Sequence, residues 1–193
     1  AIEDANLCQT TIDVTISEPA PLVIDAGNDV TICNGDVIGL NASGAISYSW
    51  TPAQDLTDPN ISNPDFNGSA TTTLTVTGTD ADGCIATDDL TVTVNPLPVV
   101  DAGADEVICT GFTVQLNASG AVSYLWSTAT NLDDANIQSP TFSGTSTETL
   151  TVTGTDGNGC VNTDDVTVTV NDLPIVDAGP DLETCEGSTV QLQ

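Results

Sequence analysis

An internal repeat with a fixed period of 76 residues constrains the fold of this chain more than any other feature of its sequence. The phrase Asp-Ala-Gly begins at Asp25, Asp101 and Asp177, and the cysteines and tryptophans recur with the same spacing. When 23–98 is aligned with 99–174 without a gap, roughly 60% of the positions are identical. Identity of this kind indicates tandem copies of one structural unit, each of which contacts mainly its neighbours.

The repeat divides the chain into four parts. Two complete repeats, 23–98 and 99–174, are flanked by the C-terminal part of a preceding repeat (1–22) and the N-terminal part of a following one (175–193). The last segment stops within an expected second strand, and a pair of strands cannot bury a core by itself. We therefore expect the natural protein to continue as a longer array on both sides. The alternative is that separate copies complete one another by strand addition.

The charge of the chain excludes several classes of function. It has no Lys, Arg or His and 28 Asp and Glu residues, so its formal net charge is −28. Such a chain repels nucleic acids and anionic membrane surfaces, and it has no side chain that acts as a base near neutral pH. We expect no enzyme, because a carboxylate-only glycosidase needs two carboxylates facing across a cleft and no motif marks one. No apolar run is long enough for direct membrane insertion.

The residue pattern within one repeat predicts an all-β fold. Apolar and polar residues alternate almost throughout, with turn residues about every eight to twelve positions, which is typical of a β-sandwich. Strands are expected near 29–33 and 38–42, whereas the Pro-, Asp- and Asn-rich segment 51–70 forms short edge strands and loops. The segment 95–98 is a short, stiff linker. The side chains expected to face the core are Ile38, Leu40, Ala42, Ile46, Tyr48, Trp50, Leu56, Ile61, Phe66, Leu74, Val76, Leu90, Val92 and Val94.

Several phrases of the repeat carry a family resemblance: Asp-Ala-Gly-x-Asp, Cys-x-Gly, Leu-Asn-Ala-Ser-Gly, Tyr-x-Trp and Thr-Val-Thr-Gly-Thr-Asp-x-x-Gly-Cys. Together they resemble the PKD-like, immunoglobulin-like repeats of giant secreted surface proteins and adhesins of Bacteroidetes-type bacteria, along the whole chain. We expect tandem immunoglobulin-like sandwiches of about seven strands, arranged as a rod. The resemblance implies an extracellular, cell-surface stalk and does not identify a ligand.

Six cysteines occupy two positions in the repeat, which in a secreted chain indicates disulfides rather than a metal site. Pairing within a repeat would join Cys33 to Cys84 and Cys109 to Cys160. In an immunoglobulin-like sandwich, however, the first turn and the last hairpin lie at opposite ends, about 33 Å apart along the last strand. We favour a disulfide between repeats, Cys33 with Cys160. The remaining cysteines would then pair with repeats outside the chain: Cys8, Cys84, Cys109 and Cys185.

Acidic residues expected near the junction between repeats suggest a cation site. Hard oxygen ligands at such a place suit Ca²⁺, which would also reduce the repulsion within an acidic chain. The alternative is that these residues only form turns, since Asp-Gly and Asn-Gly make hairpins and Asp caps turns. The candidate ligands are Asp25, Asp29, Asp80, Asp82, Asp101, Asp105, Asp156 and Asn158.

Three further groups of residues have both a functional and a structural interpretation. Tyr48 and Trp50, like Tyr124 and Trp126, could stack on a sugar, but a chain with so few aromatic residues needs them in its core. The Thr rows 73–79 and 91–93 could form a flat hydroxyl lattice as in ice-binding surfaces, although Thr also suits the solvated face of a strand. Within each of the pairs Asp88-Asp89 and Asp164-Asp165, the two side chains point to opposite faces of a strand, so they cannot form a catalytic dyad. We interpret them as residues that keep an edge strand from pairing with another chain.

The sequence therefore predicts a structural segment of the stalk or filament of a large secreted cell-surface protein. Disulfides and short Pro linkers would make it rigid, and its partners would be neighbouring repeats of the same polypeptide or fibre. The alternative is a binding module, for calcium-dependent adhesion or for carbohydrate recognition through loops such as 51–70 and 127–146. No cofactor is required by the structural interpretation, and Ca²⁺ is the one ion that the residues suggest.

Overall fold

The computed structural model describes residues 2–3, 9–11, 13–15, 18, 20–127, 129–177, 179, 183 and 185–187. The chain divides into two compact units, Ala1–Asn95 and Pro96–Gln193. A short antiparallel pair, β1 (Ile2–Glu3) with β2 (Gln9–Thr10), precedes the first sandwich. Among the described residues the only helical element is the 3₁₀ turn η1 (Ala129–Asn131), so no described helix could cross a membrane.

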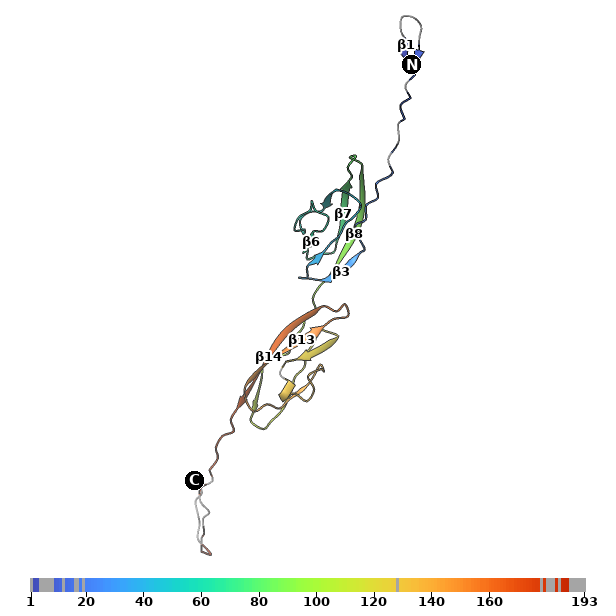
Figure 1. Cartoon of the computed structure of the whole chain (residues 1–193). Helices are drawn as coiled ribbons and strands as arrows, with labels where there is room; N and C mark the ends of the chain where they lie inside the picture. Colours follow the sequence, from blue (N-terminus) through green and yellow to red (C-terminus); the bar gives the residue numbers. More distant parts are fainter. Residues whose placement is uncertain are drawn as a thin grey trace. The chain divides into compact units, whose positions relative to one another are not determined.

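The main sheet of the first unit contains four strands in the order β3-β8-β7-β5. β7 runs antiparallel to both β5 and β8, whereas β3 runs parallel to the last four residues of β8. Figure 1 shows β7 and β8 as the long neighbouring strands of this unit. The bounds are β3 (Val30–Cys33), β5 (Ser47–Thr51), β7 (Thr72–Thr79) and β8 (Ile85–Asn95).

A smaller second layer packs on the inner face of this sheet. Its regular part is the antiparallel pair of β4 (Ile38–Gly39) with β6 (Asp65–Phe66). The strand expected at 38–42 is therefore shorter than predicted, but the pairing continues as single hydrogen bonds from Leu40 N to Pro64 O and from Ala42 N to Ser62 O, each 2.8 Å long. The two layers together form a β-sandwich.

The second unit repeats this arrangement. Its main sheet has the order β11-β13-β14-β9, and β10 pairs with β12 in the second layer. Since both units are all-β sandwiches, the predicted tandem β-sandwich fold is confirmed. The bounds are β9 (Glu106–Cys109), β10 (Val114–Gln115), β11 (Ser123–Trp126), β12 (Thr141–Phe142), β13 (Glu148–Thr155) and β14 (Val161–Asn171).

The core of each unit is built from every second residue of the long strands. In β7 the buried residues are Leu74, Val76 and Gly78, and each alternates with a half-buried or exposed Thr. This period of two is the pattern that buries one face of a sheet and leaves the other in water. The largest buried side chains of the first unit are Trp50, Phe66, Leu74, Val76 and Val92, and their equivalents fill the second.

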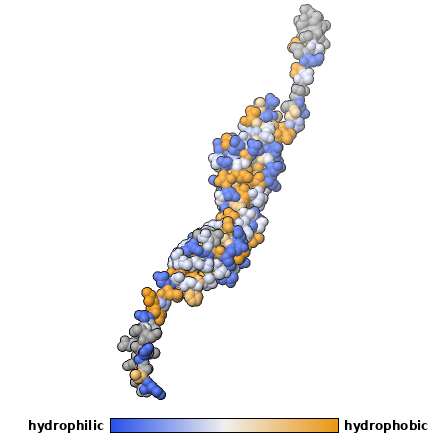
Figure 2. Space-filling view, turned by 60° about the horizontal axis from the view of Figure 1, so that its bottom comes forward, coloured by the Kyte–Doolittle hydropathy of each residue, from blue (hydrophilic) through white to orange (hydrophobic). Residues whose placement is uncertain are grey.

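Two residues that the sequence places in the core are exposed. Ile46 is spaced so that it would share the inward face of Tyr48 and Trp50. It precedes β5 at the end of the sheet, however, and its side chain is 73% exposed. Ile61 is 39% exposed, because it contributes its backbone carbonyl rather than its side chain and accepts a hydrogen bond from Trp50 Nε1. Figure 2 shows apolar residues scattered among polar ones on the surfaces of the units.

Tyr48 closes the turn before its own strand. Its hydroxyl accepts a hydrogen bond from Ala45 N (3.0 Å) and donates one to Ala45 O (2.9 Å). The second unit repeats both bonds between Tyr124 and Ala121. One hydroxyl thus satisfies a backbone donor and a backbone acceptor that no strand pairing uses.

We predict that Tyr48→Phe destabilises the first unit by about 1–2 kcal/mol, because Ala45 loses both hydrogen bonds. Amide hydrogen exchange followed by NMR measures this directly, since the Ala45 N–H should exchange faster. The Ala121 N–H, which is bound to Tyr124, should not change and serves as the control. Unchanged exchange at Ala45 would contradict this account of the turn.

Candidate functional site

Six of the eight residues proposed as calcium ligands accept hydrogen bonds from backbone amides of their own unit. Asp25 Oδ1 accepts the Gly27 N–H at 2.9 Å, and Asp80 Oδ1 accepts the N–H groups of Asp82 and Cys84 at 2.9 and 2.8 Å. These are turn-forming contacts of the kind that Asp makes with residues two to four positions ahead. The second unit repeats them from Asp101 and Asp156, and Asp177 Oδ1 accepts the Gly179 N–H.

Asp29 acts over a much longer distance in the sequence. Its Oδ1 accepts the Thr91 N–H of β8 at 2.8 Å, immediately before the four residues that pair with β3. Asp105 does the same for Thr167 at 2.9 Å. Thr91 has no partner strand on this side, and the carboxylate of Asp29 accepts its N–H in place of a strand carbonyl. The same bond fixes where β3 joins the sheet.

Six of the eight candidate ligands thus bind backbone N–H groups with their carboxylates, whereas Asp82 and Asn158 donate their own backbone N–H groups in these turns. The eight residues do not form a dense group. Asp25 and Asp29 flank the segment that leads into β3, and Asp80 and Asp82 lie in the turn between β7 and β8. In the part of the chain that the structure describes, no three side chains of His, Cys, Asp or Glu are grouped so that they could hold a metal ion. Calcium binding stays a prediction from the sequence.

The paired aspartates differ sharply in their surroundings. Asp88 lies on the inner face of β8 and its Oδ2 accepts the Ala26 N–H at 2.8 Å, whereas Asp89 is exposed on the outer face. Asp164 and Ala102 form the same bond. Asp88 thus ties the first segment of the unit to its last strand, and sequence reasoning missed this role. The signal was its place in the strand, since Asp88 lies on the same face as the core residues Leu90 and Val92. An acid at an inward position needs a donor.

The aromatic residues lie in the core rather than on a sugar-stacking surface. Trp50 and Trp126 are 1% and 2% exposed. Their Nε1–H groups donate to Ile61 O at 3.0 Å and to Ile137 O at 3.1 Å, so each indole anchors a loop of the second layer. The Thr rows form pairs across β7 and β8, in which Thr73 Oγ1 and Thr91 Oγ1 lie 3.1 Å apart on the solvated face.

The cysteines are in two different states. Cys33 and Cys160 are each disulfide-bonded, whereas Cys84 and Cys109 carry thiols outside any disulfide. Cys33 pairs in the sheet with Asn95, at the far end of β8 from Cys84. β8 spans about 33 Å at ~3.3 Å per residue, so Cys33 and Cys84 cannot form a disulfide with each other in this fold. Cys185 is exposed, and Cys8 lies outside the described residues.

The thiol of Cys84 lies in an acidic turn. The carboxylate of Asp80 raises the pKa of Cys84 above its usual value, and burial and the charge of Asp82 act in the same direction. A raised pKa leaves less thiolate at neutral pH, and the thiolate is the reactive form. Cys160 has the equivalent neighbour in the second unit, because its N–H donates to Asp156 Oδ1 at 2.9 Å.

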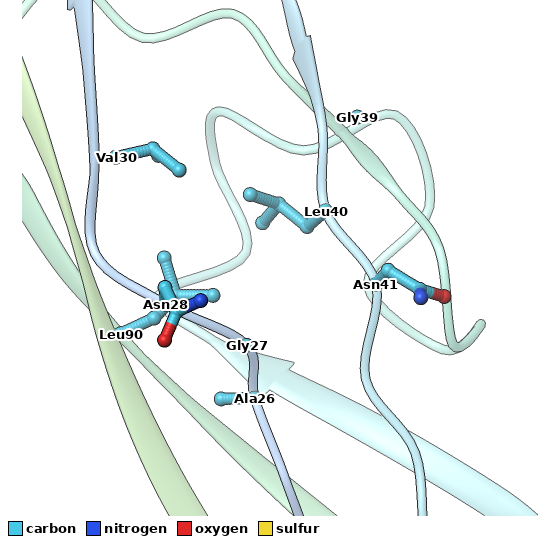
Figure 3. A pocket seen from close by; sticks show the side chains of 8 residues that line it. All are labelled: Ala26, Gly27, Asn28, Val30, Gly39, Leu40, Asn41 and Leu90. Carbon is cyan, nitrogen blue, oxygen red and sulfur yellow. The ribbon is translucent and has the colours of Figure 1, made fainter.

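The first unit has a hollow of about 300 Å³ beside the segment that precedes β3. Figure 3 shows Leu40, Leu90 and Val30 around it, with the carboxamides of Asn28 and Asn41 nearby. Its lining includes no carboxylate or thiol, so the hollow has no group that could serve as a general acid, a general base or a nucleophile. The remaining lining residues are Ala26, Gly27 and Gly39.

The geometry defines a class of domain: each unit is an immunoglobulin-like β-sandwich, and the chain carries two of them in tandem. No protein-family model matches the chain, and no curated protein matches it. Solved structures with a similar fold include the fibronectin(III)-like modules of Clostridium thermocellum CbhA, at 13% identity and a TM-score of 0.36 over 78% of this chain and 95% of that chain.

Two animal proteins are similar to a comparable degree. The insect immune protein hemolin is 16% identical with a TM-score of 0.41, over 80% of this chain and 47% of that chain. Extracellular domains 3–5 of Drosophila OTK are 12% identical with a TM-score of 0.43, over 77% of this chain and 62% of that chain.

We predict that Asp88→Ala lowers the free energy of unfolding of the first unit by about 1–3 kcal/mol, because the Ala26 N–H is left without an acceptor in a half-buried place. The neighbouring change Asp89→Ala removes the same charge from an exposed side chain and should shift it by less than about 0.5 kcal/mol. Denaturant unfolding of the two variants side by side measures the difference, and equal effects would contradict it.

We also predict that Asp80→Asn speeds alkylation of Cys84 by iodoacetamide at mildly alkaline pH. The amide keeps an oxygen for the two N–H donors and removes the charge that raises the pKa of the thiol. Cys109, in the other unit, is the internal control and should react at an unchanged rate. A Cys84 rate that stays the same or falls would show that Asp80 does not suppress the thiolate.

Proposed function

We propose that the chain is a structural segment of the stalk or filament of a large secreted cell-surface protein, stiffened by disulfides between successive repeats. Tandem immunoglobulin-like sandwiches are typical of extracellular structural and adhesion modules, and a disulfide suits an oxidising compartment. The hollow beside β3 is lined by apolar residues, glycines and two asparagines, without a carboxylate or thiol. These features favour a mechanical role over a chemical one.

The observation that carries the proposal is the state of the cysteines at the two repeated positions. Cys33 is disulfide-bonded but cannot reach Cys84 at the other end of β8, and Cys84 is a thiol. By the same geometry Cys160 cannot reach Cys109, which pairs in the sheet with Asn171 at the far end of β14. We therefore propose that Cys33 and Cys160 are bonded to each other.

A bond of this kind gives the unbonded thiols a role in a longer array. Cys84 occupies the repeat position of Cys160, and Cys109 occupies that of Cys33. In a continuous array each would bind a cysteine of a repeat beyond this chain, so that every junction carries one disulfide. The partners of the segment are then neighbouring repeats, as the sequence predicts.

The acidic surface fits the same role. With a formal charge of −28 and no cation, two such stalks repel each other at distances within the Debye length, about 8 Å at physiological salt. The chain also offers no Lys or Arg to proteases that cleave after basic residues. Both properties suit a protein that is packed densely outside the cell.

Peptide mapping without reductant tests the proposed disulfide. After digestion with proteases that cleave at acidic or aromatic residues, we expect one linked peptide pair that contains Cys33 and Cys160. The variant Cys33→Ser should lose this pair, while Cys84→Ser should keep it and serves as the matched control. A linked pair that joins Cys33 to Cys84, or Cys109 to Cys160, would overturn the proposal.

A further inference from the structure

The strand β8 has a neighbour on only one side for most of its length. β7 pairs with its residues from Ile85 to Val92, whereas β3 pairs only with Val92–Asn95. Among the described residues, the edge of β8 that faces away from β7 is therefore open over residues 85–90. An exposed strand edge of this kind is a template for pairing with another extended chain.

The direction of the backbone groups shows what this edge offers. Thr91 donates its N–H away from β7 to Asp29 Oδ1 at 2.8 Å, so alternate residues along β8 point their N–H and C=O groups the same way. Thr79 O, which accepts the Ile46 N–H on the β5 side, indicates the same alternation in β7. Among the described residues, neither strand pairing nor a side chain takes up the outward N–H of Thr87 or Asp89.

The second unit has the same open edge. β13 pairs with β14 from Val161 to Val168, and β9 begins to pair only at Val168. The Thr167 N–H is held by Asp105 Oδ1 at 2.9 Å, and the residues that offer outward groups are Thr163 and Asp165. Two copies of one backbone edge therefore recur at a fixed interval along the chain.

The side chains along each edge restrict what can bind there. In order along β8, Ile85 is 68% exposed, Thr87 is exposed, and Asp89 is exposed. Asp165 repeats the acid in the second unit. A second copy of this chain brings further carboxylates and no cation to the edge, and like charges on adjacent strands are destabilising. Opposite charges across a strand pair are favourable. The carboxylates on this edge would therefore stabilise a bound basic strand and repel an acidic one.

We propose that the open edges of β8 and β14 bind an extended segment of another protein that carries Lys or Arg, by strand addition. The backbone N–H and C=O groups of Thr87 and Asp89, and of Thr163 and Asp165, form the ladder. The carboxylates of Asp89 and Asp165 select a basic partner against copies of the chain itself. An apolar residue of the partner strand packs beside Ile85 or Val161.

A synthetic peptide in which Lys alternates with Val is the probe, and amide hydrogen exchange followed by NMR is the readout. We expect saturating peptide to slow exchange of the Thr87, Asp89, Thr163 and Asp165 N–H groups by at least tenfold. The control peptide has the same sequence and charge but carries N-methyl groups on the residues that would donate to the edge. It should give no protection, because it cannot form the ladder.

Variants of the protein separate the backbone contribution from the charge. Asp89→Asn should weaken binding at the first unit by about two- to fivefold, whereas Asp58→Asn makes the same charge change on an exposed loop and should leave it unchanged. Thr87→Pro removes an outward N–H and should abolish protection at Asp89. Protection at Thr163 in the same molecule shows that the second unit still binds.

Each of the following outcomes would overturn the proposed binding of a basic strand. Equal binding of the N-methylated peptide, or equal effects of Asp89→Asn and Asp58→Asn, would mean a general attraction to a polyanion and would overturn the proposal. Absence of binding would overturn it as well. Without peptide, exchange of the Thr87 N–H could slow as the protein concentration rises. A second copy of the chain would then occupy the edge, and the proposal of a basic partner would be wrong. If Thr87→Pro unfolds the first unit, the two peptides on the unchanged chain still decide.

Discussion

The hydrogen bond between an aspartate and a distant backbone amide is the interaction on which this fold depends. A chain with 28 acidic residues and no basic one cannot form ion pairs between side chains, so N–H groups are the donors that its carboxylates can bind. Asp88 holds Ala26, and Asp29 holds Thr91, each across 62 residues of sequence. These two bonds fasten the first segment of a unit to its last strand, and they recur in the second unit.

Much of the fold could be predicted from the sequence because it follows from alternation and repetition. The period of two along β7 and β13 places Leu74 and Leu150 in the core, and the repeat shows that whatever one copy forms, the other forms too. Parity alone failed at Ile46, which has the inward parity but lies beyond the end of β5. Where a layer ends is set by tertiary packing, and the sequence alone does not show it.

The roles of the acidic residues were harder to predict. Asp25 and Asp80 were expected either to bind calcium or to form turns, and the structure shows the turn contacts. The contacts of Asp29 and Asp88 are between residues far apart in sequence, and they become visible only once β3 is known to run parallel to β8. The proposal for the cysteines relies on the same register, because it places Cys33 at the far end of β8 from Cys84.

Stretching single molecules under force tests the proposed disulfide between repeats most directly. If Cys33 and Cys160 are bonded, the residues between them cannot be pulled out under force. In the oxidised molecule only the segments outside the two cysteines should therefore extend. Reduction should then release roughly 450 Å of additional contour length, at about 3.6 Å for each extended residue. If the oxidised molecule already unfolds both units to their full length, the repeats are not joined, and the stalk proposed here has no such staple.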